Sequence, residues 1–283
     1  MYLINPDELI DRAESLQPIP ASTARLISLI NKGDCDVDEI ANVIALDQAL
    51  TLRLLRDANS AFSASYLTIS TVGEAVSRLG TARVVSLALS SHAKPLLHQR
   101  LPEYDLAEGQ LWRHSVLASL AADAAVRFCR TEIPPASSTA ALLHDIGKLV
   151  MAQFLKPQIL ELLQRAKTEG GLSPLEAEAT LLQVNHAELG GLIGRRWKLP
   201  DNIVLGIMHH HAPAEGADVI CDVVYLANLA AKKIEAGLSG KQLDFKVDAG
   251  VAQRLGTDIR QFPDLCNQGA QMFQKVAALY GVK

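Results

Sequence analysis

A histidine and an aspartate stand side by side in an otherwise apolar stretch of this chain. His144 and Asp145 follow Leu143 and precede Ile146, within a segment that the sequence predicts to be helical. Burying two polar groups of this kind costs free energy unless each finds a partner. One interpretation is a hydrogen-bonded core histidine beside a capping aspartate. The other is a metal ion held between helices, because imidazole and carboxylate are both common metal ligands.

Further histidines favour the metal interpretation. Helical bundles build polar sites from side chains on several helices, and the histidines of this chain lie on four predicted helices. Helical periodicity turns His114 and His186 inward, so we expect both to lie within a few ångströms of His144 and Asp145. Lys148 follows on the same side as His144, where its amine could bind a phosphate group or pair with Asp145. Six of the eight histidines lie between positions 114 and 211: His114, His144, His186, His209, His210 and His211.

The composition predicts an all-α protein that positions these residues. Hydrophobic residues make up 49% of the 283 residues and aromatic residues only 5%, which suits close-packed helices. Apolar residues recur with helical spacing, and Thr71 and Glu74 have the spacing of a capping box. We expect two packed helical subdomains joined by a linker between Pro95 and Pro102. The predicted helices are two or three short ones over 22–31 and 36–59, one that starts at Thr71 and stops at Gly80, and further helices over 81–97, 106–129, 138–155, 157–169, 174–197, 201–211, 217–236 and 264–280.

Charge and cysteine usage limit the possible partners. The formal net charge is −4 and the four cysteines form no CxxC pair, so we expect a cytoplasmic protein without a basic surface for nucleic acid. The start of the chain lacks a signal peptide, and no apolar stretch is long enough to span a bilayer. Residues 36–59 have the pattern of a helix-turn-helix. Five acidic side chains against two basic ones in that segment would repel DNA phosphates.

The histidine pattern resembles the HD superfamily of metal-dependent phosphohydrolases, and most closely its HDOD (HD-related output domain) branch of bacterial signalling proteins. The resemblance covers roughly residues 14–235, with an N-terminal subdomain over 14–100, an HD-like subdomain over 103–236 and a C-terminal helical extension over 237–283. It implies that the metal ligands are His114, His144, Asp145, His186, His209 and His210. The matching segments are residues 16–20, 47–51, 54–62, 75–80, 111–115, 142–150, 186–190, 197–200 and 209–210.

The chain departs from the enzymes of that superfamily at two positions. Asn228 stands where an aspartate completes the metal site of the HD enzymes, and a neutral amide is a poorer ligand for a divalent cation. Asp222 cannot replace that aspartate, since six helical residues turn its side chain about 240° away. The Gly-Tyr-Pro signature of the cyclic di-GMP hydrolases is missing after the paired histidines, where the chain reads His211-Ala212-Pro213.

These observations predict a non-catalytic regulatory module with a degenerate HD-type site, acting through contacts with signalling proteins in trans. The alternative is an active metal-dependent phosphohydrolase on a nucleotide or another phosphoester. In that case iron, manganese or zinc would generate the nucleophile, and Asp145 and Lys148 would be the candidate catalytic residues. The predicted partners are other signalling proteins and a small nucleotide ligand, without DNA or membrane.

Overall fold

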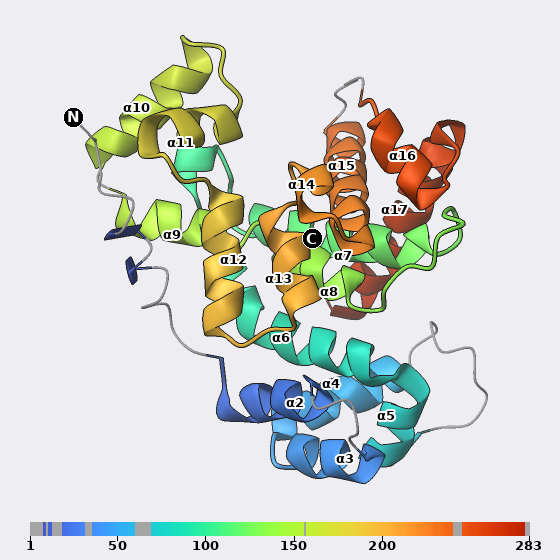
Figure 1. Cartoon of the computed structure of the whole chain (residues 1–283). Helices are drawn as coiled ribbons and strands as arrows, with labels where there is room; N and C mark the ends of the chain where they lie inside the picture. Colours follow the sequence, from blue (N-terminus) through green and yellow to red (C-terminus); the bar gives the residue numbers. More distant parts are fainter. Residues whose placement is uncertain are drawn as a thin grey trace. The chain divides into compact units, whose positions relative to one another are not determined.

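The computed structural model describes residues 8–9, 11–12, 19–31, 36–59, 69–155, 157–239 and 245–280. Helices dominate these residues, and the extended pairing found among them is one isolated bridge between Leu101 and Leu106 (Figure 1). The all-α prediction is therefore confirmed. Within the described part of the chain, no helix has both the length and the apolar character needed to cross a membrane.

The chain divides into two compact units. One unit contains residues 17–95 together with 197–200, and the other contains 1–16, 96–196 and 201–283. Several sequence expectations fall outside the described residues. These are the start of the domain at residue 14 and the motif residues 16–18 and 60–62.

The smaller unit is a set of helices whose ends are fixed by capping residues. Asp47 begins α4 by accepting a hydrogen bond from the backbone of Leu50 at 3.0 Å. Thr71 and Glu74 form both halves of the predicted capping box at the start of α5. Asn59 ends α4, and its side chain exchanges two hydrogen bonds of 2.7 Å with the backbone of Ile69. The helices of this unit are α2 (Ala21–Asn31), α3 (Val37–Ala45), α4 (Gln48–Ala58), α5 (Val72–Leu79) and most of α6 (Thr81–Leu97).

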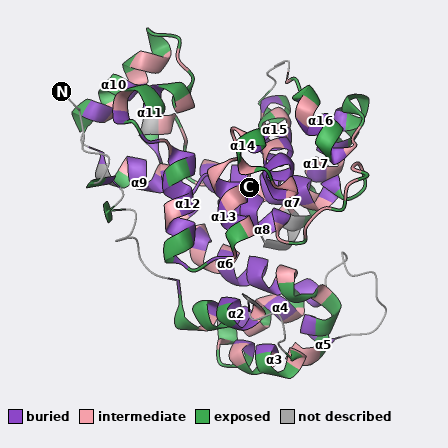
Figure 2. Ribbon diagram, in the orientation of Figure 1, coloured by how far each residue is buried: buried purple, intermediate pink, exposed green. Residues whose placement is uncertain are grey.

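The larger unit is built around one buried helix, α7 (Gln110–Ala125). Residues on all sides of α7 are buried, and it packs against α8, α15 and α17 (Figure 2). A helix that is apolar all round belongs in a core. The elements of this unit are η2 (Pro102–Tyr104), α7, α8 (Ser137–Leu143), α9 (Gly147–Phe154), α10 (Pro157–Thr168), α11 (Pro174–Leu182), α12 (His186–Arg196), α13 (Asp201–Met208), α14 (Pro213–Gly216), α15 (Val219–Leu238), α16 (Ala249–Leu255), η3 (Ile259–Gln261) and α17 (Phe262–Tyr280).

Two predicted helices are interrupted, which corrects the sequence interpretation. The expected helix over 138–155 breaks into α8 and α9 at a turn over residues 144–146. The expected helix over 174–197 breaks into α11 and α12, where Gln183 adopts a left-handed conformation with φ of 56°. Pro95 does not open a linker, since it lies inside α6. Apolar periodicity continues across such breaks because both halves pack on the same core, so the pattern alone hides them.

Candidate metal centre

The turn between α8 and α9 positions the His-Asp doublet. His144 is the residue at which α8 ends, and Gly147 begins α9 two residues after Asp145. The backbone of α12 passes so close to Gly147 that an added Cβ would lie 1.8 Å from the carbonyl oxygen of His186. This close approach brings α12 and its histidine against the doublet.

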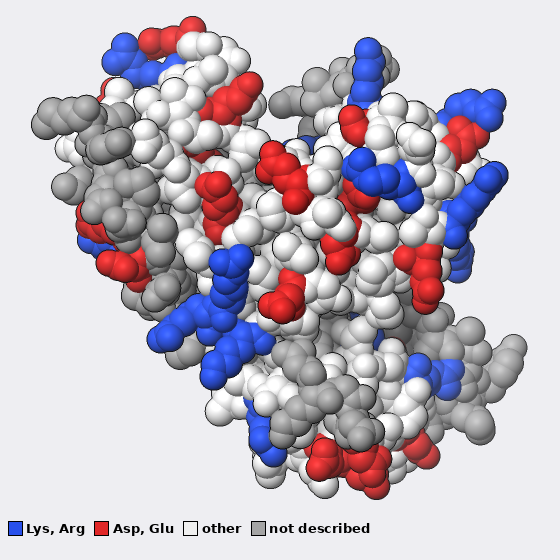
Figure 3. Space-filling view, viewed as in Figure 1, with Lys and Arg blue, Asp and Glu red and all other residues white. Residues whose placement is uncertain are grey.

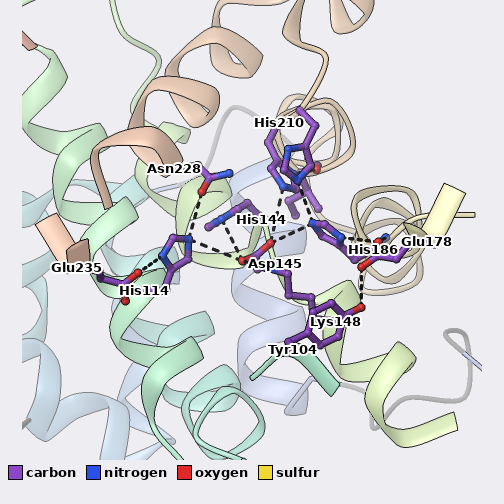
Figure 4. A network of polar contacts seen from close by, with 12 residues as sticks. Tyr104, His114, His144, Asp145, Lys148, Glu178, His186, His210, Asn228 and Glu235 are labelled. Atoms are coloured by element: carbon purple, nitrogen blue, oxygen red, sulfur yellow. Dashed lines mark hydrogen bonds and ion pairs between the residues drawn. The ribbon is translucent and has the colours of Figure 1, made fainter. Parts of the chain in front are cut away.

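Four histidine rings surround the carboxylate of Asp145 (Figure 4). The Oδ1 atom lies 3.3 Å from Nε2 of His186 and 3.8 Å from Nε2 of His210. The Oδ2 atom lies 3.5 Å from Nε2 of His144 and 3.7 Å from Nε2 of His114. The expected proximity of His114, His144, Asp145 and His186 is therefore what the structure shows, and all of these side chains are buried.

Backbone carbonyls orient two of these rings. Nδ1 of His144 lies 2.7 Å from the carbonyl oxygen of Ala141, and Nδ1 of His210 lies 2.7 Å from that of Ile207. A carbonyl only accepts, so each Nδ1 carries the proton and each Nε2 keeps a lone pair. Both Nε2 atoms are buried without a hydrogen-bond partner, as is Oδ1 of Asp145. Buried, unpartnered electron pairs that converge on one point fit a cation.

Glu178 and Tyr104 hold the ring of His186. Oε2 of Glu178 accepts hydrogen bonds from the backbone N–H of His186 at 2.8 Å and from its Nδ1 at 2.7 Å. The Tyr104 hydroxyl donates to Oε1 of Glu178 at 2.8 Å. A carboxylate behind a histidine fixes its tautomer and raises its basicity, as in many metal sites. Sequence reasoning missed Glu178 and Tyr104, which lie on other elements and carry no motif.

The ring of His114 is engaged on both of its nitrogen atoms. Nδ1 lies 2.9 Å from Oε2 of Glu235, and Nε2 lies 3.2 Å from Oδ1 of Asn228. Through these two interactions, His114 of α7 contacts α15, which carries Asn228 and Glu235. Asp222, on the same helix, instead pairs with Arg254 at 2.6 Å, in agreement with the expectation that it does not replace the missing aspartate.

Of the three adjacent histidines, the structure places His210 and His211 in a possible donor group, whereas the sequence predicted the pair His209 and His210. Nε2 of His211 lies 3.1 Å from Nε2 of His186. The structure does not bring His209 into either donor group; its side chain packs beside Gly216. The cause is the end of α13 at Met208, after which helical rotation no longer predicts direction. Two groups could each hold an ion: His186 with His210 and His211, and His114 with His144 and Asp145.

Burial and neighbouring charges shift the pKa values of the centre in opposite directions. Burial lowers the pKa of His144 to about 3 and, with the neighbouring His186, that of His211 to about 2. Burial alone would lower the pKa of His186, but the charge of Glu178 and the contact with Asp145 outweigh it and raise this pKa. Burial would raise the pKa of Asp145, yet Lys148, whose Nζ lies 2.5 Å from Oδ2, and His144 hold it well below its usual range.

Comparisons with known proteins identify the family. A model of the HDOD domain matches residues 16–213. An uncharacterized protein of Treponema pallidum (strain Nichols) is 25% identical over 240 residues, which cover 83% of this chain and 46% of that protein. The chain therefore spans less than half the length of this curated relative.

Solved structures share the fold over nearly the whole chain. An HDOD domain protein of unknown function from Geobacter sulfurreducens has a TM-score of 0.68 at 21% identity, with 97% of this chain and 98% of that chain covered. A candidate phosphohydrolase from Shewanella amazonensis SB2B has a TM-score of 0.70 at 22% identity, over 95% and 98%. A candidate signal transduction protein from Marinobacter aquaeolei VT8 has a TM-score of 0.71 at 22% identity, over 95% and 60%.

Proposed function

Because this chain belongs to the HDOD family, we propose that it is a regulatory signalling module whose His-Asp centre holds a divalent cation without catalysing hydrolysis. The contact between Asn228 and His114 carries this proposal. Nδ1 of His114 faces the carboxylate of Glu235 and therefore donates to it. Its Nε2 then either accepts from the amide nitrogen of Asn228 or, on a protonated ring, donates to the amide oxygen. In both arrangements Asn228 engages the nitrogen that would otherwise bind a metal.

The rest of the centre supports cation binding. His144, His210 and Asp145 direct unpartnered, buried atoms inward, and imidazole with carboxylate suits manganese, iron or zinc. With Asn228 in place of aspartate, the site has one negative charge fewer to offset a divalent ion. We therefore expect weak cation binding that stabilises the fold.

We further propose that the partners are signalling proteins in trans and that the ligand is a small nucleotide. The name of the Marinobacter aquaeolei relative fits this role. A role in DNA binding is disfavoured by the net charge of −4. On the face in Figure 3, basic side chains of the described residues lie in small groups interspersed with acidic ones, which is unsuited to a phosphate backbone.

A second candidate function is metal-dependent phosphoester hydrolysis. The observation that favours it is the presence of two adjacent donor groups with Lys148 beside them. Divalent ions, when bound, would polarise a phosphoryl oxygen as Lewis acids. Lys148 could then leave Asp145 and contact the phosphate. The name of the Shewanella amazonensis relative is in keeping with this alternative.

Element analysis and a hydrolysis assay separate the two candidates. The protein is purified without added metal, analysed for bound manganese, iron and zinc, and then assayed on bis(p-nitrophenyl) phosphate with Mn²⁺. We expect less than stoichiometric metal and no hydrolysis above that of Asp145→Ala. Near-stoichiometric metal together with Mn²⁺-dependent hydrolysis that Asp145→Ala abolishes would show that the protein is an enzyme.

A further inference from the structure

The loop that follows α6 contacts two residues that hold the centre, Glu178 and Lys148. Residues 98–109, which we call the connecting loop, are closed by paired backbone hydrogen bonds of 2.9 and 3.0 Å between Leu101 and Leu106. A third bond of 2.9 Å joins the backbone N–H of Gly109 to the carbonyl of His98. Gln164 of α10 also donates to the carboxylate of Asp105 at 3.1 Å. The loop is thus a closed and braced element, and η2 within it carries Tyr104.

Tyr104 touches the centre by two separate routes. Its hydroxyl donates to Oε1 of Glu178 at 2.8 Å, and the other oxygen of Glu178 holds the ring of His186. Its aromatic ring lies 5.6 Å from the Nζ of Lys148, within the range of a cation–π contact. That same Nζ pairs with Asp145 at 2.5 Å. The loop is therefore linked to the histidine of the centre through Glu178 and to its aspartate through Lys148.

We propose that Tyr104 is a positioning residue for His186, acting through Glu178, and that it couples the connecting loop to the His-Asp centre. Glu178 is 1% exposed, so bulk solvent does not reach it to replace a lost donor. Without the phenolic hydroxyl, Oε1 would be a buried carboxylate oxygen lacking its partner, which favours rotation of the carboxylate. Such a rotation would release Nδ1 of His186 and with it the direction of Nε2. A displacement of the connecting loop would have the same effect.

The first test observes the His186 ring in metal-free protein. Imidazole ¹⁵N NMR distinguishes the Nδ1–H from the Nε2–H tautomer, and His186→Gln assigns the signals. With spectra recorded at a pH where His186 is neutral, we expect a single Nδ1–H tautomer in the wild type and averaged nitrogen shifts in Tyr104→Phe, which deletes only the hydroxyl and keeps the ring beside Lys148. The control is Tyr225→Phe, which removes a partly buried hydroxyl that hydrogen-bonds with the backbone of Asp248 instead. Wild-type His186 shifts in Tyr104→Phe would overturn the proposal.

A double-mutant cycle tests whether Tyr104 acts through Glu178. Removing an outer partner of a ligating histidine typically costs about 10- to 100-fold in metal affinity. Titration with Mn²⁺ should therefore show a loss of about tenfold in Tyr104→Phe, a larger loss in Glu178→Gln, and no further loss in the double variant. Additive losses would contradict the route through Glu178. The double-mutant cycle rests on the proposed cation binding. A wild-type protein that does not bind Mn²⁺ would refute that function. The NMR result would still decide the role of Tyr104.

Discussion

The two oxygen atoms of Asp145 serve different parts of the centre. Oδ1 faces His186 and His210, while Oδ2 faces His144, His114 and the ammonium group of Lys148. A single carboxylate thus lies between both donor groups, and Lys148 neutralises it. A cation that entered the centre would compete with Lys148 for the same charge, which is one reason to expect weak binding in the protein as it stands.

Asn228→Asp should increase the effect of metal on stability. The added carboxylate would face His114 and the cation, and carboxylates suit divalent ions better than amides do. With chelator, the same change buries a second negative charge near Asp145 and should lower the melting temperature by about 5 °C, equivalent to about 2 kcal/mol. Melting curves with Mn²⁺ and with chelator measure both effects. Asn202→Asp, which adds the same charge at a partly exposed position, is the control.

The comparison with wild type decides the interpretation of that variant. Stabilisation by Mn²⁺ that is much larger in Asn228→Asp supports a degenerate centre retained as a scaffold. Equal, strong stabilisation of both proteins would mean that Asn228 is a tolerated ligand or a bystander. The preference for a non-catalytic role would then have to be withdrawn.

Acidification should destabilise the metal-free protein between pH 7 and pH 5. The folded-state pKa values of His144 and His211 are about 3 and 2, whereas an unfolded histidine titrates near pH 6.5. The unfolded chain therefore binds more protons in this range, and stability falls as pH falls. The raised pKa of His186 acts in the opposite direction and offsets part of the loss.

The expected size of the destabilisation follows from the same difference in proton binding between the folded and unfolded chain. At pH 5 each histidine held neutral costs up to about 2 kcal/mol, so the net fall in melting temperature should be about 5 °C or more. Thermal melts in chelator across this range measure it. A melting temperature that stays constant or rises on acidification would contradict the prediction.

At the scale of elements, the centre depends on how closely α9 and α12 approach each other. Gly147 faces the backbone of His186 and Gly190, and neither backbone can move without shifting α12. The helix that carries His186 is thus held against the turn that carries Asp145. A glycine that looks like a minor part of the His-Asp motif in the sequence is what allows the motif to meet its partner histidine.

Gly147→Ala should destabilise the fold by about 3 kcal/mol, because its Cβ would lie 1.8 Å from the carbonyl oxygen of His186 and the backbones would have to separate. Urea unfolding measures the change. Gly237→Ala is the matched control: it lies in α15 of the same unit with open space around it, and alanine there should stabilise by about 0.5–1 kcal/mol. Equal stability of Gly147→Ala and wild type would show that α12 tolerates the displacement.

The sequence predicted helices and inward-facing histidines well, because both follow from local periodicity. It predicted the breaks at residues 144–146 and 183–185 poorly, since apolar spacing continues through them. Periodicity could not decide between His209 and His211 for a related reason: beyond the end of α13, side-chain direction depends on the turn. The roles of Glu178 and Tyr104 could not be predicted, because they arise from tertiary contacts. Glu178 binds His186 eight positions away, and Tyr104 binds Glu178 74 positions away.

At the scale of the whole molecule, the HDOD match ends at residue 213, yet the larger unit continues to the end of the described chain. The helix α15 carries Asn228 and Glu235, and α17 packs on both α7 and α15. A Cβ added at Gly269 would lie in ordinary van der Waals contact with Ala121 and Ile234, so α17 lies against the helix that carries His114. Within the extension predicted over 237–283, the described helices α16 and α17 therefore pack on the helices that support the centre.

Truncation after Ser239 should consequently abolish cooperative unfolding of the larger unit. It removes α16 and α17, whose side chains Leu255, Leu265 and Phe273 are buried. Burying each such side chain contributes about 2 kcal/mol, and together with the α7 surface that they cover the loss is on the order of 10 kcal/mol, comparable with the net stability of a typical domain. Circular dichroism melts of residues 1–239 against the full chain measure it, and adding a peptide of residues 245–283 in trans should restore part of the transition. If residues 1–239 melted at the temperature of the full chain, the extension would be an accessory to the centre and not a part of its support.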